Sequence, residues 1–401
     1  MLIDKLLDYV KYDTTSSEDS ETSPSTSGQW DLANHLKEEL EKLGLEQVQL
    51  DENCYVYGYL PGDEEYLTLG LIAHMDTSEQ ASGKDVKPRI IENYDGTDIK
   101  LNDELYTTVE RFPNLKDYIG KTLVVTDGTT LLGADDKAGV ACIMEVLETL
   151  IDNKELKHGP IWVCFSPDEE IGRGTAHFNY DLFKVDFAYT LDGDKPEYIE
   201  YENFNAASAV IDVNGISVHP GSAKDKMVNA LQVAHEFHAM TDPEARAEKT
   251  DGYDGFNLLM GLEGEVGHAR MQYIMRNHDM AKLRKQKSDF EKIAKTLNEK
   301  YGYEVIDLKL KDSYRNMKEK FEGHMEPIEL VRKAMAECGM ECKSQAIRGG
   351  TDGASLTWNG ILCPNLGTGG QNFHGVHEFW CKEDGELVVR MVLTLLGMAK
   401  R

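Results

Sequence analysis

Apolar strands that alternate with helical segments constrain the fold of this chain more than any other feature of its sequence. The runs LTLGLIAH, PIWVCFS and FAYTLD are apolar enough to form buried strands, and GADDKAGVACIMEVLETL has apolar residues at helical spacing. Strands that alternate with helices predict a largely parallel sheet with helices on both faces. We therefore expect an α/β domain with a central, mostly parallel sheet flanked by helices.

The pattern changes near residue 204. AASAVIDVNGIS alternates like a half-exposed strand, DKMVNALQVAHEFHAM is helical, and two alternating strands, a charged helix from Met280 to Tyr301 and the strand YEVIDLKLKD follow. This βαββαβ succession predicts an α+β domain inserted at 205–318. The first pattern resumes near Glu326, so residues 1–204 and 319–401 are expected to form one interrupted domain. The length of 401 residues also favours two domains.

Charge and composition exclude several classes of partner. A formal net charge of −28 opposes binding to nucleic acid or to an anionic membrane surface. The chain has no run of about 18 apolar residues that could span a bilayer, and its first residues, MLIDKLLDYVKYD, lack the pattern of a signal peptide. The seven cysteines are scattered, and several lie in apolar runs. We expect a cytoplasmic protein with reduced, structural cysteines.

Five short segments carry His, Asp or Glu directly after apolar runs: HMDT, GADDKAG, SPDEEIG, TLDGD and GTGGQNFHGVHEF. Open α/β sheets bind ligands at the ends of their strands. Taken alone, each segment has an ordinary explanation, such as helix capping by Asp or a solvated acidic turn. Together they supply imidazoles and several carboxylates at the same topological position, which suits a dinuclear zinc centre.

The types and spacing of these residues indicate which of them could bind metal, orient a ligand or transfer a proton. His74 and Asp76 lie two residues apart at a strand end, so both can project from the same side, where a carboxylate can orient a metal-binding imidazole. Asp135 is followed by a second Asp, and two adjacent carboxylates are costly to bury without a cation. Of Glu169 and Glu170, one could bind a metal and the other could accept a proton from water.

The ordered motifs HMDT, LGADDKAG, SPDEEIGRG, LDGD and FHGVHEF resemble the zinc peptidase clan that includes aminoacylases, carboxypeptidases and dipeptidases. Longer strings, among them PSTSGQW, SGKDVKPRIIENYDGTDI, VNGISVHPGSAKDKMVNA and RGGTDGASLT, resemble the peptidase T family along nearly the whole chain. The resemblance implies an aminopeptidase that uses two zinc ions to remove the N-terminal residue of tripeptides, with the inserted domain as a lid. A homodimer is also expected from the behaviour of the family.

The resemblance assigns roles to individual residues. It implies five zinc ligands, with Asp135 as the bridge between the two ions: His74, Asp135, Glu170, Asp192 and His374. Asp76 matches the residue that orients His74, and Glu169 matches the general base. His374 is preferred as the ligand over His377, which stands where many relatives have a carboxylate.

Three further residues match positions that contact the substrate. His219 in SVHPG resembles a lid histidine that steadies the reacting carbonyl, and Arg276 and Arg348 match positions that hold the terminal carboxylate of the peptide. A related carboxypeptidase, dipeptidase or N-acyl amino acid hydrolase, or a metal-stabilised binding protein without catalysis, would carry a similar centre. The peptidase T strings favour the aminopeptidase, and an intact Glu169 argues against the loss of catalysis.

Overall fold

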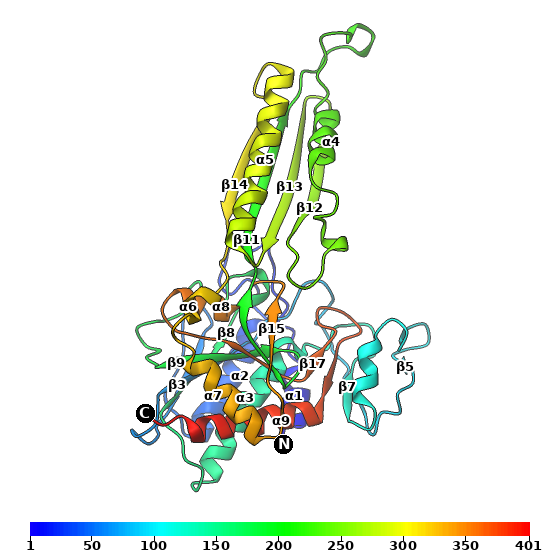
Figure 1. Ribbon diagram of the computed structural model, residues 1–401. Helices are drawn as coiled ribbons and strands as arrows, with labels where there is room; N and C mark the ends of the chain where they lie inside the picture. The colour runs from blue at the N-terminus through cyan, green and yellow to red at the C-terminus, as the bar shows by residue number, and fades with distance from the viewer. The chain divides into compact units, whose positions relative to one another are not determined.

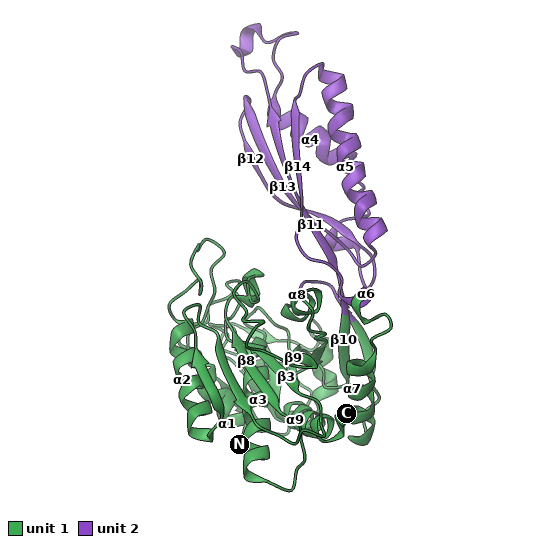
Figure 2. Ribbon diagram, turned by 90° about the vertical axis from the view of Figure 1, so that its left-hand side faces the viewer, with its two compact units in different colours: residues 1–201, 320–345, 351–401 green, residues 202–319, 346–350 purple.

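The computed structural model describes residues 1–401, which form two compact units (Figure 2). Unit 1 comprises Met1–Tyr201, Lys320–Gln345 and Thr351–Arg401, and unit 2 comprises Glu202–Glu319 and Ala346–Gly350. The short segment Ala346–Gly350 therefore packs with unit 2, although its sequence was assigned to the interrupted domain. Arg348 in this segment donates hydrogen bonds to the backbone of residues 250–254, which explains why the segment belongs to unit 2.

Unit 1 is built on an eight-stranded sheet with the order β1-β2-β8-β3-β9-β16-β10-β15 (Figure 1). The strands are β1 (Glu46–Leu50), β2 (Val56–Leu60), β3 (Leu69–His74), β8 (Ile161–Ser166), β9 (Phe187–Gly193), β10 (Tyr198–Asn203), β15 (Lys343–Ile347) and β16 (Asn365–Gly367). The central strands β8, β3, β9 and β16 run parallel, whereas β2 and β10 join them antiparallel. The predicted parallel sheet is thus confirmed at the centre of a sheet that is mixed overall.

Helices cover both faces of this sheet, as predicted. They are α1 (Leu2–Tyr9), α2 (Gln29–Leu43), α3 (Ala134–Asp152), α7 (Glu326–Glu337), α8 (Asp352–Trp358) and α9 (Lys382–Met398), and the short α6 (Lys318–Phe321) lies at a unit boundary. On one face α3 packs against β3 and β9, and α1, α2 and α9 pack against α3. The other face carries a cluster that includes Leu356 of α8. In this cluster Leu356, together with Phe178 and Phe183 from the segment between β8 and β9, packs on Tyr57 and Trp162. Every residue of β3 and β8 is buried, and burial from both sides explains why these strands are apolar up to their last residues, His74 and Ser166.

A small four-stranded sheet brings two distant loops together in unit 1. Its order is β17-β18-β7-β4, with β17 (Gly370–Gln371), β18 (Phe379–Cys381), β7 (Leu123–Val125) and β4 (Arg89–Ile91). The pairing of β18 with β7 places the loop before β18, which carries His374, His377 and Glu378, beside the loop between β7 and α3, which leads into GADDKAG at the start of α3. A separate hairpin of β5 (Ile99–Lys100) and β6 (Tyr106–Thr107) completes this turn-rich region.

Unit 2 has the predicted βαββαβ succession. It consists of β11 (Asn205–Asn214), α4 (Ala230–Met240), β12 (Phe256–Gly264), β13 (His268–Asn277), α5 (Met280–Tyr301) and β14 (Ile306–Asp312). The strands form one antiparallel sheet in the order β12-β13-β11-β14. Ile211, Phe237, Tyr273 and Phe290 belong to the core that joins the helices to the sheet.

Composition gave expectations about membrane spans and about the cysteines. No helix combines the length and the apolar character needed to cross a membrane. All seven cysteines are free, and Cys142, Cys164 and Cys363 are fully buried. Their prediction as small core residues is confirmed.

Candidate metal centre

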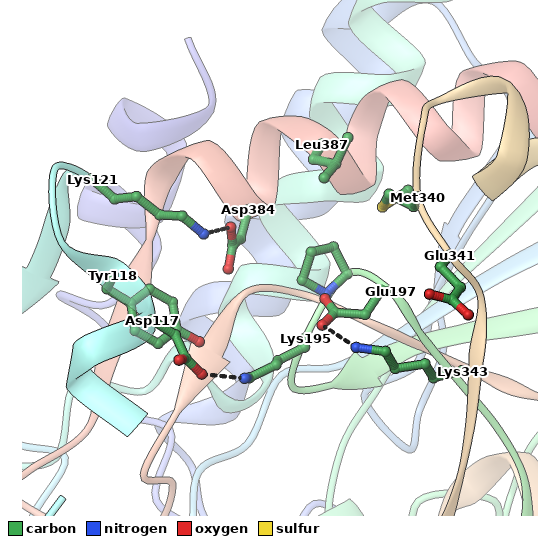
Figure 3. A pocket seen from close by; sticks show the side chains of 11 residues that line it. Asp117, Tyr118, Lys121, Lys195, Glu197, Met340, Glu341, Lys343, Asp384 and Leu387 are labelled. Atoms are coloured by element: carbon green, nitrogen blue, oxygen red, sulfur yellow. Dashed lines mark hydrogen bonds and ion pairs between the residues drawn. The ribbon is translucent and has the colours of Figure 1, made fainter. Parts of the chain in front are cut away.

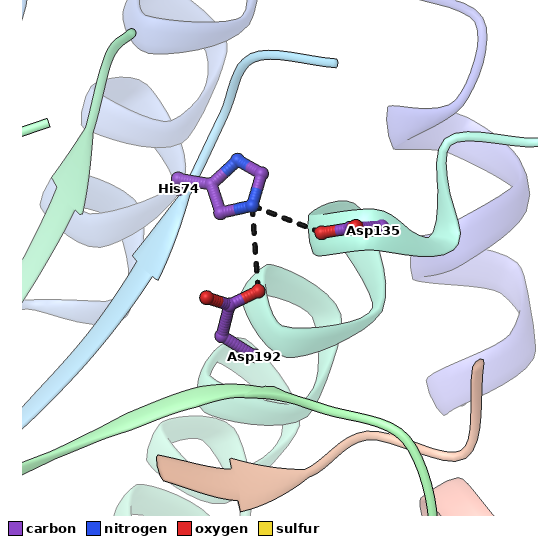
Figure 4. A group of neighbouring side chains, drawn as sticks. All are labelled: His74, Asp135 and Asp192. Carbon is purple, nitrogen blue, oxygen red and sulfur yellow. Dashed lines mark hydrogen bonds and ion pairs between the residues drawn. The ribbon is translucent and has the colours of Figure 1, made fainter. Parts of the chain in front are cut away.

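The carboxyl ends of β3 and β9 place His74 beside Asp192 (Figure 4). Ile72 and Thr190 are partners in the parallel register, and His74 and Asp192 each follow two residues later. His74 Nε2 lies 3.4 Å from Asp192 Oδ1. These two side chains are therefore close together because the strands pair, since the carboxyl ends of parallel strands meet at one edge of the sheet.

Asp135 lies between two imidazoles. Its Oδ1 is 3.0 Å from His74 Nε2 and its Oδ2 is 3.0 Å from His374 Nε2. His374 Nε2 also lies 3.1 Å from Glu170 Oε2. The side chain of Asp135 does not cap α3, and its backbone is not helical (φ −87°, ψ 105°), so the ordinary explanation as a capping residue does not apply.

The five residues expected as zinc ligands thus form two groups that share Asp135: one is His74, Asp135 and Asp192, and the other is Asp135, Glu170 and His374. Within each group the potential ligand atoms all lie within 4.8 Å of one another. Asp135 presents one carboxylate oxygen to each group. This is the position of a carboxylate that bridges two cations.

Asp76 contacts both His74 and the turn that carries Glu169 and Glu170. It is completely buried, and its Oδ1 lies 3.3 Å from His74 Nδ1. Its two oxygens accept the backbone N–H groups of Glu169 at 2.9 Å and Glu170 at 3.1 Å. Asp76 therefore holds an imidazole and an acidic turn at a fixed separation.

Glu378 is a functional candidate to which sequence reasoning gave no role. Its side chain is 1% exposed, and it accepts backbone N–H groups of Leu132 at 2.7 Å, Gly133 at 2.8 Å and Asp135 at 3.0 Å. It thus binds the loop that presents Asp135. Its place after His377 in FHGVHEF was the only signal in the sequence.

His377 lies apart from both groups of ligand atoms. Its Nδ1 is 2.9 Å from Thr107 Oγ1, and its ring packs 4.7 Å from the ring of Phe112. Burial, followed by the charge of Arg111, lowers the pKa of His377. Of the two histidines in FHGVHEF, the structure brings only His374 to the other ligand candidates.

The electrostatics of the centre favour bound positive charge. Burial and then the negative charge of Asp135 raise the pKa of Glu170 to about 7, and burial and then Asp192 raise the pKa of Glu169. Hydrogen bonds with Asp135 and Glu170 raise the pKa of His374 to about 11. These shifts show how costly it is to bury several carboxylates together without a cation.

The donor atoms fit divalent cations. Imidazole nitrogen and carboxylate oxygen are the ligands that zinc takes in hydrolytic enzymes. In addition, Glu170 Oε1 is buried without a hydrogen-bond partner, so one strong acceptor in the second group is unused by the protein itself. The two groups therefore have the residue types, the shared carboxylate and the free acceptor that a dinuclear site needs.

The three expected substrate contacts all belong to unit 2 and are not part of the cluster in unit 1. His219 is exposed, and its Nδ1 accepts the backbone N–H of Gly221 at 3.1 Å. Because Nδ1 is the acceptor, Nε2 carries the proton in the neutral ring and can donate it. His219 therefore presents a hydrogen-bond donor at the surface of unit 2.

The two arginines differ in how many contacts they already make. Arg276 donates from Nη1 to the carbonyl of Met275 at 3.0 Å and, at 3.4 Å, to that of Ala207. Arg348 donates to the carbonyls of Gly252 at 2.6 Å and Asp254 at 3.0 Å and to Thr250 Oγ1 at 3.1 Å. Arg348 is thus largely engaged in holding its own unit together.

Unit 1 has a further cavity of about 440 Å³, beside the 3₁₀ helix η1 (Pro113–Tyr118) and α9 (Figure 3). Its three lysines are each paired with an acidic side chain that also lines it: Lys121 with Asp384 at 2.6 Å, Lys195 with Asp117 at 2.7 Å and Lys343 with Glu197 at 3.6 Å. Because these charges neutralise one another within the protein, we assign no ligand to this cavity.

Comparison with known proteins identifies the family. A family model described as Peptidase family M20/M25/M40 matches residues 124–397. The chain is 48% identical over 403 residues to Peptidase T of Alkaliphilus oremlandii, covering 99% of this chain and 98% of the relative. It is 51% identical over 401 residues to Peptidase T of Caldanaerobacter subterraneus subsp. tengcongensis, with 99% and 98% covered.

Solved structures share the fold at lower identity. The aminopeptidase PepT of Bacillus cereus superposes with a TM-score of 0.78 at 22% identity, covering 99% of this chain and 97% of that one. The YXEP protein of Bacillus subtilis, described as a dinuclear metal-binding peptidase of the M20 family, gives a TM-score of 0.65 at 14% identity, with 99% and 97% covered.

The fold and the cluster of imidazoles and carboxylates define a class of hydrolases in which an α/β unit carries the reaction centre and an α+β unit is inserted into it. Within this class the chain belongs to peptidase family M20/M25/M40. The relatives that it resembles along nearly their whole length carry the name peptidase T. The resemblance inferred from the motifs is therefore confirmed, and the chain is a peptidase.

Proposed function

We propose that this peptidase removes the N-terminal residue of tripeptides, with two zinc ions as cofactors and Glu169 as the general base. The observation that carries the proposal is the pair of ligand groups that share Asp135, with the Glu169–Glu170 turn held beside them by Asp76. The substrate class is supported by relatives named peptidase T at 48% and 51% identity.

One zinc ion would be held by His74, Asp135 and Asp192, and the other by Asp135, Glu170 and His374. Two divalent cations there would supply polarisation of the scissile carbonyl and a lowered pKa of the attacking water. Asp76 keeps His74 Nδ1 occupied, so that Nε2 faces the first group.

Glu169 accepts a proton from the attacking water and then gives it to the amine nitrogen of the leaving peptide. Burial and the neighbouring Asp192 raise the pKa of Glu169. A carboxylate with a raised pKa is a stronger base than an exposed one.

Residues of unit 2 complete the proposal. His219 would donate its Nε2–H to the oxygen that becomes negative in the transition state. For the terminal carboxylate of the substrate we favour Arg276 over Arg348, because Arg276 uses only Nη1 in its contacts with backbone carbonyls. Arg348 would have to exchange hydrogen bonds with the backbone of residues 250–254 before it could bind a substrate.

The chain is further proposed to act in the cytoplasm and to form a homodimer. Both proposals come from the resemblance to the peptidase T family. Light scattering on the purified protein at several concentrations tests the dimer, since a mass twice the chain mass of 45.1 kDa is expected. A mass that stays at one chain contradicts it.

The function is tested by mass spectrometry of cleavage products with added zinc. The substrates are a free tripeptide, its N-acetyl form and the matching dipeptide, and the variants are Glu169→Gln and, as a control, Glu386→Gln on the surface of α9. We expect release of the N-terminal residue from the free tripeptide only, with a loss of about 10²-fold or more in Glu169→Gln.

The other outcomes are equally informative. Cleavage of the N-acetyl peptide would place the enzyme among the N-acyl hydrolases of the clan instead. Full activity in Glu169→Gln would show that Glu169 is not the base. A loss in Glu386→Gln would show that the assay reports general damage to the protein.

A further inference from the structure

The Ser/Thr-rich loop between α1 and α2 is bound to the turn that carries Glu169 and Glu170. Asp168, 1% exposed, accepts hydrogen bonds from the backbone N–H of Ser25 at 2.8 Å, Ser25 Oγ at 2.6 Å and Gln29 Nε2 at 2.7 Å. In return the backbone N–H of Asp168 is donated to Gln29 Oε1 at 3.2 Å. Asp168 and Gln29 therefore form a closed, reciprocal pair.

These three residues form a buried polar cluster inside unit 1. Gln29 is completely buried and Ser25 is 7% exposed. Asp168 forms no ion pair, so its carboxylate depends on the donors of Ser25 and Gln29. A buried carboxylate is tolerated only when its lone pairs are satisfied in this way.

The backbone of Asp168 gives the cluster its connection to the reaction centre. Asp168 has φ 59° and ψ 27°, in the left-handed region, and directly precedes the 3₁₀ turn η2 (Glu169–Ile171). A residue with a Cβ keeps this conformation when surrounding interactions fix it. The hydrogen bonds of Asp168 therefore determine the direction in which the chain enters the turn of Glu169 and Glu170.

The same loop is attached at two other places. Arg173, just after the turn, donates from Nη1 to the carbonyl of Ser20 at 2.6 Å. Near the strand end that carries His74, Ser16 N–H donates to the carbonyl of Thr77 at 3.0 Å. The acidic turn is thus held by Asp76 on one side and by the loop, through Asp168, on the other.

We propose that Asp168 is a positioning residue that, together with Ser25 and Gln29, sets the place of Glu169 and Glu170 in the reaction centre. The inference rests on the proposed function, because it assigns Asp168 a role through the base Glu169 and the ligand Glu170. A displaced base lowers the rate of the chemical step, while substrate contacts made elsewhere are unchanged. Weakening the cluster is therefore expected to lower kcat and to leave KM near its wild-type value.

The decisive variant is Asp168→Asn. It keeps the shape of the side chain but sets an amide NH₂ group against the N–H donors of Ser25 and Gln29. We expect kcat on a free tripeptide to fall by about ten- to a hundredfold, the size of effect that misplacement of a catalytic group can produce. The affinity of the weaker of two bound zinc ions should also fall by about tenfold, because Glu170 is displaced with Glu169.

The matched control is Asp384→Asn on α9. Asp384 is similarly buried, at 6% exposed, and bonded to Lys121. This control should lower the melting temperature without a change in kcat or zinc affinity. The second variant, Gln29→Glu combined with Asp168→Asn, returns an acceptor to face the new amide and should restore most of kcat. Ser25→Ala, which removes one donor, should lower kcat less than Asp168→Asn and serves if that variant does not fold.

The proposal is overturned if folded Asp168→Asn, or Ser25→Ala in its place, keeps the kcat and the zinc affinity of the wild type. It is also overturned if Asp384→Asn loses as much of both. If the wild type itself releases nothing from a free tripeptide, the proposed function fails, and the zinc affinities of the same variants still decide whether Asp168 positions Glu170.

Discussion

At the scale of single residues, Asp76 shows how one buried carboxylate supports several groups. It contacts His74 Nδ1 and accepts the backbone N–H groups of Glu169 and Glu170. We expect Asp76→Ala to weaken zinc binding by about ten- to a hundredfold, because the turn loses both of its acceptors and the imidazole keeps only the backbone carbonyl of residue 76, 3.0 Å from His74 Nδ1. Titration with zinc in a competing chelator measures the effect.

The control for Asp76→Ala is Asp51→Ala. Asp51 also accepts two backbone N–H groups, those of Asn53 and Tyr55, each at 2.9 Å, but it contacts none of the ligand candidates. It should change stability and leave zinc affinity unaltered. Equal zinc affinities in both variants and the wild type would contradict the role of Asp76.

Glu200 on β10 gives a prediction about pH and stability. Burial, followed by the charge of Asp194, raises the pKa of Glu200 from 4.5 to about 8. At a pH between these two pKa values, Glu200 is protonated in the folded chain and ionised in the unfolded chain. Its contribution to the free energy of unfolding is therefore complete at low pH and declines as the pH rises toward 8. In Glu200→Gln, which cannot titrate, this contribution to the decline is absent.

Urea unfolding at several pH values between about 5 and 8 measures this difference. The free energy of unfolding should fall more steeply with pH in the wild type than in Glu200→Gln. The comparison with the variant isolates Glu200 from other buried carboxyls, such as Asp352, whose pKa burial raises to about 7. Parallel profiles would show that Glu200 does not hold a proton in the folded chain.

At the scale of elements, α5 begins at a residue with a clear capping role. Asp279 accepts the backbone N–H groups of Ala281 at 2.7 Å and Lys282 at 3.1 Å. Asp279→Ala should lower the free energy of unfolding by about 1 kcal/mol, whereas Glu291→Ala on the exposed side of the same helix should change it by less than about 0.5 kcal/mol. Equal effects, measured by urea unfolding, would contradict the importance of the cap.

Elements with strong local signals were predicted well, and elements without them were not. The bounds of α5 were predicted because its charged helical pattern ends at Gly302, which is left-handed at φ 76°. The helix expected from residue 225 begins only at Ala230, because the side chain of Asn229 accepts the N–H of Leu231 and starts the helix there. The hydrophobic pattern continues from residues 225–229 into α4, so periodicity alone could not locate the start of this helix.

At the scale of the whole molecule, the candidate metal centre joins parts of the chain that are far apart in sequence. Removal of zinc with a chelator should lower the melting temperature of the protein, because a cation that binds only the folded chain stabilises it. Return of zinc should restore the original value, with two ions bound per chain by elemental analysis. An unchanged melting temperature after complete removal would contradict a metal centre within unit 1.

The sequence by itself determined the class of the fold and the candidate ligands, because both depend on local patterns. Apolar runs determine where buried strands lie, and motifs such as HMDT and GADDKAG place imidazoles and carboxylates at strand ends. These patterns singled out the segments, and the resemblance to the peptidase T family then named the five ligand candidates and Asp76 within them. The structure brings all six residues together.

Only the tertiary structure decided which polar residues outside the motifs support the centre. Glu378 reaches the loop of Asp135 because β18 pairs with β7, and Ser25 and Gln29 reach Asp168 because a polar loop folds back onto the acidic turn. The physical reason is that a hydrogen bond between residues more than a hundred positions apart leaves no periodicity in the sequence. Its partners are determined by the packing of strands and loops, which local composition does not record.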